Sequence, residues 1–177
     1  VTFPKMTGQS PIYYAHHHTG RAPSEQEILI DEIPLEAGQT SLGCTSFYMD
    51  AGFGPLFPFG YGLSYTTFQY GNASLNAPEI KDGEQVTLTI PVSNTGKYDG
   101  EEVVQVYLRH PGDKEGPSHA LRAFKRVAIA KGATNNVTIP LSKENFEWFD
   151  TSTNTMRPIE GDYEILYGGT SELKQLK

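Results

Sequence analysis

The chain has 177 residues and a formal net charge of -7, with 37% hydrophobic and 11% aromatic residues. This length fits one domain or slightly more, with enough apolar surface to bury a core without covalent staples. The acidic balance excludes nucleic acid as an expected partner, because phosphates require patches of Lys and Arg. The longest basic cluster, Arg122, Lys125 and Arg126, is typical of one solvated strand face. No apolar stretch reaches about 18 residues, so neither a transmembrane helix nor a membrane partner is expected.

The first 70 residues are not expected to form an independent core. They hold twelve of the twenty aromatic residues, yet glycines and prolines interrupt every long periodic element. The one helix candidate is Ser24–Asp31. Aromatic side chains need a surface to pack against, so these residues indicate a segment that completes another domain.

Two features of this segment suggest chemistry at first sight. His16, His17 and His18 are adjacent, but successive side chains of an extended chain point to opposite sides. We therefore expect a polar loop, with no metal or cofactor. Cys44 is the single cysteine, so no internal disulfide is available. It is either a nucleophile or an inert buried thiol, and we expect the second.

Carboxylates are the other candidates in this segment. Acidic residues cluster between Glu25 and Glu36, and Asp50 lies between Tyr48 and Phe53. A glycosidase pair requires two carboxylates about 5–10 Å apart across a sugar, a geometry that a sequence does not display. We expect a solvated loop for the cluster. For Asp50 we expect a carboxylate that fixes its own loop through backbone hydrogen bonds.

Residues 71–177 have the period-2 pattern of β-strands. Val86, Leu88, Ile90 and Val92 alternate with Thr, Pro and Ser, which places one set on a buried face. Further strands are expected at 73–75, 103–108, 124–129, 137–140, 148–149 and 163–167, with a helical turn at 142–145. About seven short strands separated by turn signals predict an immunoglobulin-like sandwich.

Two motifs resemble family 3 glycoside hydrolases. Gly8-Gln9-Ser10-Pro11-Ile12-Tyr13-Tyr14, followed by Thr19-Gly20-Arg21, resembles their Gly-Gln-x-Pro-x-Tyr-Tyr…Gly-Arg segment. The run from Pro55 to Thr66 resembles their Phe-Pro-Phe-Gly-x-Gly-Leu-Ser-Tyr-Thr signature. Downstream, five matches resemble the fibronectin type III-like domain that follows in many members: Asn94-Thr95-Gly96, Gly100, Val104–Leu108, Leu121–Val127 and Phe146–Asp150.

The resemblance covers essentially the whole chain and implies a mainly β fold in two parts. Residues 1–70 would be the C-terminal segment of an α/β sandwich domain, and residues 71–177 a fibronectin type III-like, immunoglobulin-like β-sandwich. The implied enzyme is a retaining, exo-acting β-glycosidase that removes terminal β-D-glucosyl residues from β-glucosides and cello-oligosaccharides. No residue matches the family's Asp nucleophile or acid/base Glu. The chain is therefore expected to have a structural role and to lack the catalytic carboxylates.

Phe47, Tyr48 and Phe53 are the candidate substrate-binding residues, because aromatic rings stack on sugar faces; buried packing is the alternative for them. The expected partners are the remainder of the hydrolase and a β-linked oligosaccharide, with a homodimer as a further option. Family habit favours a periplasmic or secreted location. Three alternatives stay open: a β-xylosidase of the same family, a non-hydrolytic relative such as a phosphorylase, and a non-catalytic binding or scaffolding sandwich.

Overall fold

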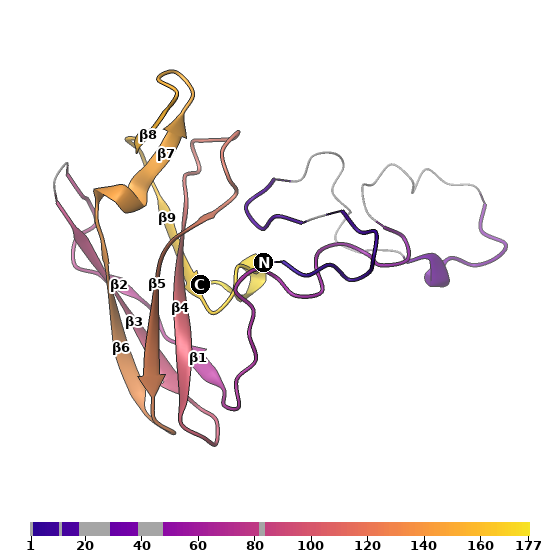
Figure 1. Cartoon of the computed structure of the whole chain (residues 1–177), viewed down its shortest axis with the longest axis horizontal. Helices are drawn as coiled ribbons and strands as arrows, with labels where there is room; N and C mark the ends of the chain where they lie inside the picture. Colours follow the sequence, from indigo (N-terminus) through magenta and orange to yellow (C-terminus); the bar gives the residue numbers. More distant parts are fainter. Residues whose placement is uncertain (1, 11, 18–28, 39–47, 82–83) are drawn as a thin grey trace.

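The structure is a computed structural model that describes residues 2–10, 12–17, 29–38, 48–81 and 84–177. Figure 1 shows two parts, a β-sandwich and an extended segment that projects from one side of it. We call residues 68–177 the sandwich and the described residues before Phe68 the arm. Within the described residues, no helix is long and apolar enough to cross a membrane.

The sandwich consists of a four-stranded sheet, a three-stranded sheet and a two-stranded hairpin. In the four-stranded sheet, β3 pairs with β6 along one edge and with β1 and β2 along the other. In the three-stranded sheet, β4 lies between β5 and β9, and β7 and β8 form the hairpin. The strands are β1 Phe68–Tyr70, β2 Ser74–Leu75, β3 Val86–Asn94, β4 Gly100–Arg109, β5 Ala120–Ile129, β6 Thr134–Leu141, β7 Glu147–Asp150, β8 Thr155–Pro158 and β9 Glu164–Gly168. The 3-10 turns are η1 Ile30–Glu32, η3 Lys143–Phe146 and η4 Leu173–Gln175.

The core lies between the two larger sheets and follows from side-chain alternation. Every second residue of β3 is buried, from Val86 to Asn94. These side chains meet Val104, Val106 and Leu108 of β4 and the buried residues of β6. Each fully buried aliphatic side chain contributes about 1.5–3 kcal/mol. The predicted β-sandwich is therefore confirmed.

The strands that the sequence did not predict are short. β8 pairs only with β7, and β1 has three residues. Three residues are too few to display a period, but β1 is held by pairing with β3 and by the Tyr70 hydroxyl, which donates to Glu102 Oε1 of β4 at 2.7 Å. The division after residue 70 stays a prediction. Because β1 lies before it, the sandwich sheet includes residues from both sides of that point.

The basic cluster does not share one solvated face, so that expectation was wrong. The register between β4 and β5 shifts at Val106, which leaves Arg122 as an extra residue of β5. Its guanidinium carbon lies 4.6 Å from the centroid of the buried Trp148 ring. Lys125 and Arg126 pair with successive residues of β4 and therefore point to opposite faces.

The arm has little regular structure. Its described residues contain η1 and two isolated antiparallel bridges, Phe3 with Phe57 and Tyr48 with Gly52. Most of the helix candidate Ser24–Asp31 lies outside the described residues, as does Cys44. Exposed aromatic and aliphatic side chains are frequent along the arm.

Candidate functional site

Two of the candidate substrate-binding residues, Tyr48 and Phe53, lie on a tight turn of the arm that runs from Tyr48 to Gly54. The backbone N–H groups of Ala51 and Gly52 both donate to the Tyr48 carbonyl, at 3.1 and 2.6 Å. Gly52 and Gly54 have φ angles of +69° and +81°, which residues with a side chain rarely adopt. The two glycines explain how the chain reverses so sharply here.

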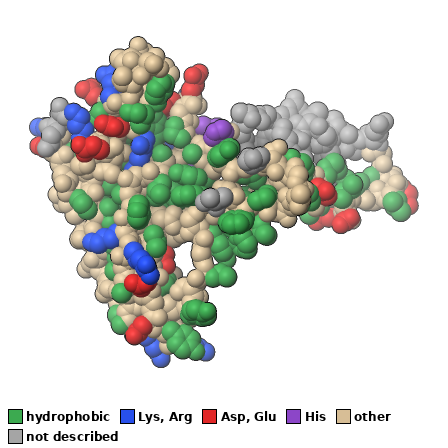
Figure 2. All heavy atoms as spheres, in the orientation of Figure 1, with side chains coloured by type: hydrophobic (Ala, Val, Ile, Leu, Met, Phe, Trp, Pro, Cys, Tyr) green, Lys and Arg blue, Asp and Glu red, His purple; other side chains and the backbone are tan. Residues whose placement is uncertain are grey.

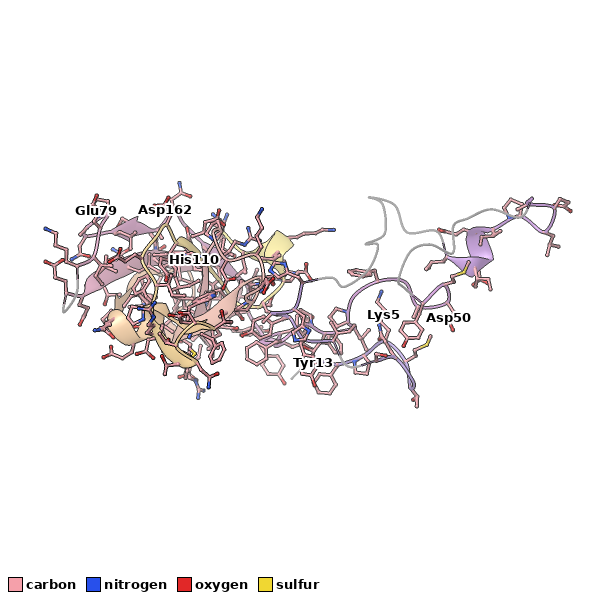
Figure 3. All side chains as sticks on the ribbon, turned by 90° about the horizontal axis from the view of Figure 1, so that it is seen from above. Lys5, Tyr13, Asp50, Glu79, His110 and Asp162 are labelled. Carbon is pink, nitrogen blue, oxygen red and sulfur yellow. The ribbon has the colours of Figure 1, made fainter. Side chains whose placement is uncertain are left out.

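Gln9 of the first family-like segment and Lys5, which precedes that segment, hold this turn in place. The Lys5 ammonium donates to the carbonyls of Ala51 and Phe53 at 2.8 and 2.9 Å. The Gln9 amide donates to the Gly54 carbonyl at 3.1 Å and accepts the Lys5 backbone N–H at 2.7 Å. Figure 3 shows Lys5 and Asp50 in the same region of the arm, far from the sandwich. We call Lys5 and Gln9 the clamp.

Tyr48 is fixed through its hydroxyl while its ring stays partly exposed, at 39%. The hydroxyl accepts the Ser10 backbone N–H at 3.0 Å and lies 3.1 Å from Ser10 Oγ. The bond to the Ser10 side chain and then the bond to its backbone lower the pKa of the phenol. Phe53 is partly buried in the same turn, and Phe47 lies outside the described residues.

The described acidic residues near the turn are exposed. Asp31, Glu32 and Glu36 face solvent, and Glu32 accepts the Leu29 backbone N–H at 3.0 Å. Asp50 is also exposed. Among the described residues, no group of three or more His, Cys, Asp or Glu side chains could hold a metal ion.

The described histidines do not gather at one site. His16 and His17 are exposed on the arm, and the His16 ring lies 5.4 Å from that of Tyr13. His110 lies in the sandwich, where its ring meets Tyr163 at 4.8 Å (Figure 3). His18 lies outside the described residues.

Aromatic packing joins the arm to the outer face of the three-stranded sheet. The Tyr14 ring stacks on Phe59 at 4.8 Å and meets the edges of Tyr107 and His119 at 5.7 and 5.2 Å. Tyr107 is fully buried although it points away from the sandwich core, because the arm covers it. Such aromatic pairs contribute about 0.5–1.5 kcal/mol beyond the area they bury.

Hydrogen bonds satisfy the side chains of Gln105 and Tyr107, which are buried beside these rings. Gln105 Nε2 donates to the carbonyls of Gly60 and Gly169 at 3.2 and 2.6 Å, while its Oε1 accepts the Tyr107 hydroxyl at 2.6 Å. The backbone N–H of Ser171 donates to the Phe59 carbonyl at 2.9 Å. Gln105 therefore connects the arm, β4 and the segment after β9.

His119 is the histidine of this contact and is 2% exposed. Its Nε2 lies 3.0 Å from the Ser171 carbonyl, and its Nδ1 lies 3.0 Å from Ser118 Oγ. Because a carbonyl only accepts, Nε2 carries the proton in the neutral ring. Burial lowers the pKa of His119, against a smaller opposing effect of the Ser171 bond. We call this contact the junction: Tyr14, Phe59 and Gly60 of the arm with Gln105, Tyr107 and His119 of the sandwich.

A groove of about 880 Å³ lies at another part of the sandwich, between the segment after β2 and the segment before β9. Its lining mixes Glu79, Lys81, Glu160 and Asp162 with apolar residues. The Tyr163 ring is engaged edge-on with Phe146 at 5.2 Å, and its hydroxyl donates to the Ile159 carbonyl at 2.7 Å. Tyr163 is thus held within the sandwich by these contacts.

The sequence prediction singled out the turn but missed the junction. Tyr14 and Phe59 belong to the two family-like motifs, and no local pattern pairs them with His119. One signal was available. The run Val103–Leu108 is apolar except for Gln105, and a near-continuous apolar run is typical of a strand covered on both faces.

Comparisons with known proteins agree with this architecture. Residues 102–171 match the fibronectin type III-like domain family. The chain is 49% identical over 122 residues to a xylan 1,4-beta-xylosidase of Xylanibacter ruminicola, which covers 69% of this chain and 14% of the relative. It is 34% identical over 151 residues to a periplasmic beta-glucosidase of Salmonella typhimurium, covering 85% of this chain and 18% of the relative.

A solved structure matches the arm and the sandwich together. The beta-glucosidase of Listeria innocua in complex with isofagomine has a TM-score of 0.76 and 30% identity, covering 99% of this chain and 22% of that one. The chain thus spans less than a quarter of the length of these three relatives. It carries a fibronectin type III-like domain and corresponds to the C-terminal part of a family 3 glycoside hydrolase of the β-glucosidase type.

Proposed function

We propose that the chain is the C-terminal portion of a retaining, exo-acting β-glycosidase that removes terminal β-D-glucosyl residues from β-glucosides and cello-oligosaccharides. The observation that carries this proposal is the match of arm and sandwich together to a beta-glucosidase of known structure. A free binding module would have no need of the arm. The catalytic carboxylates belong to the part of the hydrolase outside this chain, and the role of the chain is structural.

The test compares the complete hydrolase with the 177-residue chain alone. The complete hydrolase should release glucose from the non-reducing end of cello-oligosaccharides with retention of configuration, and the chain alone should release none. Hydrolysis by the isolated chain would overturn the structural role. Inversion of configuration would overturn the mechanism, since a retaining enzyme forms a glycosyl-enzyme with a second close carboxylate.

A β-xylosidase is the second candidate, and one observation favours it: the 49% identity to a xylan 1,4-beta-xylosidase. Parallel assays with aryl β-glucosides and aryl β-xylosides decide between the two. A higher kcat/KM for the xyloside would replace our first proposal.

Within this function, we assign the Tyr48–Gly54 turn to the aglycone side of the substrate site, with Tyr48, Phe53 and Phe47 as stacking residues. The support is the clamp, which fixes the turn through three hydrogen bonds, and the partly exposed Tyr48 side chain. Tyr48→Ala in the complete hydrolase should raise KM for cello-oligosaccharides more than for an aryl glucoside. Phe149→Ala, at a half-exposed ring on β7, is the matched control. Equal effects of the two variants would remove Tyr48 from the site.

The relatives also support export of the hydrolase, because the Salmonella typhimurium relative is described as periplasmic. Fractionation of cells that produce the complete hydrolase tests this. Activity confined to the cytoplasmic fraction would contradict it.

A further inference from the structure

The Tyr48–Gly54 turn lies shortly before the part of the arm that packs on the sandwich. Gly54 ends the turn, and Phe59 and Gly60 of the junction come soon after it in the chain. Figure 2 shows hydrophobic side chains gathered where the arm meets the sandwich. The candidate substrate-side turn and the sandwich are therefore joined by a short stretch of backbone that is itself held in place.

The first described residues of the arm brace this stretch and the turn together. Phe3 pairs with Phe57: the Phe3 backbone N–H donates to the Phe57 carbonyl at 2.9 Å, and the Phe57 N–H donates to the Phe3 carbonyl at 3.4 Å. The two rings meet edge-on at 6.4 Å. Lys5 and Gln9, which follow Phe3, form the clamp on the turn. A displacement of the connecting stretch therefore acts on the clamp as well.

Gln105 of β4 holds the sandwich end of this connection. Its side chain is buried, and both N–H groups of its amide are used, one toward the Gly60 carbonyl of the arm and one toward the Gly169 carbonyl. Its Oε1 accepts the Tyr107 hydroxyl at 2.6 Å. The amide is thus fixed by groups of the sandwich, and it sets where the Gly60 carbonyl lies.

We propose that Gln105 is a positioning residue for the aglycone side of the substrate site. It sets the place of the Tyr48–Gly54 turn through Gly60, the Phe3–Phe57 bridge and the clamp. This inference rests on the proposed function, which assigns the turn to that side. A shift of about 1 Å in a group that positions substrate is enough to change a rate strongly. The sandwich therefore takes part in the choice of substrate.

The first experiment compares two substrates of the complete hydrolase. Gln105→Met fills a similar volume and removes all three hydrogen bonds. It should raise KM for cellotriose about three- to tenfold, while kcat and KM for an aryl β-glucoside stay within about twofold. Ile90→Val weakens the buried core of the same sandwich, and as the matched control it should change neither substrate. Equal effects on both substrates, or the same pattern in Ile90→Val, would overturn the proposal.

Tyr107→Phe tests the same contact in a milder form. It keeps the ring and its edge contact with Tyr14, and it removes only the hydrogen bond to Gln105 Oε1. KM for cellotriose should rise in this variant too, by less than in Gln105→Met. An unchanged KM in Tyr107→Phe, beside losses on both substrates in Gln105→Met, would assign Gln105 to folding alone.

A double variant shows whether Gln105 acts through the turn. Adding Gln105→Met to Tyr48→Ala should raise KM for cellotriose no further than Tyr48→Ala does alone, because two changes in one connected contact are not additive. Effects that multiply would show that Gln105 acts by another route, and the proposal would fail. If the hydrolase prefers xylosides, xylotriose and an aryl β-xyloside replace the glucose substrates in every assay.

Hydrogen exchange gives a readout that needs no substrate. The Ala51 and Gly52 backbone N–H groups donate to the Tyr48 carbonyl within the turn. Both amides should exchange faster in the Gln105→Met hydrolase than in the wild type and the Ile90→Val control. Unchanged exchange there would refute the connection, whatever the sugar. Faster exchange with no effect of Tyr48→Ala on any KM would instead remove the turn from the substrate site, and with it the role of Gln105 in substrate binding.

Discussion

Alanine substitution at two glycines, Gly60 and Gly132, tests how strongly the junction holds the arm on the sandwich. Gly60 has a φ of +77° and Gly132 a φ of +75°, so alanine carries the same left-handed penalty of about 1–2 kcal/mol at either position. Their surroundings differ. Among the described residues, nothing lies within 4 Å of a Cβ built on Gly132, whereas a Cβ on Gly60 would lie 2.1 Å from Gln105 Oε1. Gly60→Ala therefore tests the contact, with Gly132→Ala as its control.

The extra cost at Gly60 follows from what Gln105 holds. The Gln105 side chain is buried and makes three hydrogen bonds, so moving it away from a new methyl group disrupts bonds to Gly169 and Tyr107 as well as to Gly60. Each buried polar group left without a partner costs about 1–3 kcal/mol. Gly60→Ala should lower the free energy of unfolding by about 2–4 kcal/mol more than Gly132→Ala does. The difference cannot be larger than the free energy with which the arm docks on the sandwich.

The assay needs one reporter for each part of the molecule. Trp148, the single tryptophan, is buried in the sandwich, and its fluorescence follows urea unfolding there. The backbone N–H groups of Ser118 and Ser171 donate to the Ala15 and Phe59 carbonyls of the arm, so their hydrogen exchange follows docking. Both amides should exchange faster in Gly60→Ala. Unfolding free energies of the two variants within about 0.5 kcal/mol, with unchanged exchange, would refute the reasoning.

Further predictions concern the core, the Arg122 contact and pH. Ile90→Ala, at a fully buried position of β3, should lower the free energy of unfolding by about 2–5 kcal/mol, measured in urea. Arg122→Met should cost about 1 kcal/mol through loss of the contact with Trp148, and Arg126→Met, at an exposed pair with Glu101, should cost less in the same assay. Because burial lowers the pKa of His119 below its usual 6.5, the unfolded chain takes up a proton that the folded chain resists. The contribution of His119 to the free energy of unfolding should be fully present above pH 6.5. It should decrease as the pH falls below that value, by at most about 1.4 kcal/mol per pH unit. His119→Gln should flatten this fall when urea midpoints are measured across the range, and an unchanged slope would contradict the assignment.

The sandwich could be predicted from the sequence because each strand is specified by a pattern of neighbouring residues. The alternation from Val86 to Val92 specifies one buried face, and a shift of one residue would expose the whole set. Arg122 shows where local information fails. It becomes the extra residue of a bulge, so a fixed period assigns it to the wrong face. The junction is harder still, since Tyr14 and His119 are about a hundred positions apart and neither has a periodic neighbour that would predict the contact.

The same contrast explains why the arm and the sandwich differ in how far they bury their own apolar side chains. The sandwich buries its apolar side chains within itself, with Ile90, Val92, Val104 and Val106 all at 0% exposure. The arm turns its aromatic residues in two directions: Tyr14 and Phe59 pack on the sandwich, while Tyr65 faces solvent. Glycine-dependent turns and the clamp set its backbone path without a core of its own. A segment that is specified in this way acts as a connector. One side of the arm packs on the sandwich through Tyr14 and Phe59, and the other side leaves apolar side chains such as Leu63 and Tyr65 exposed.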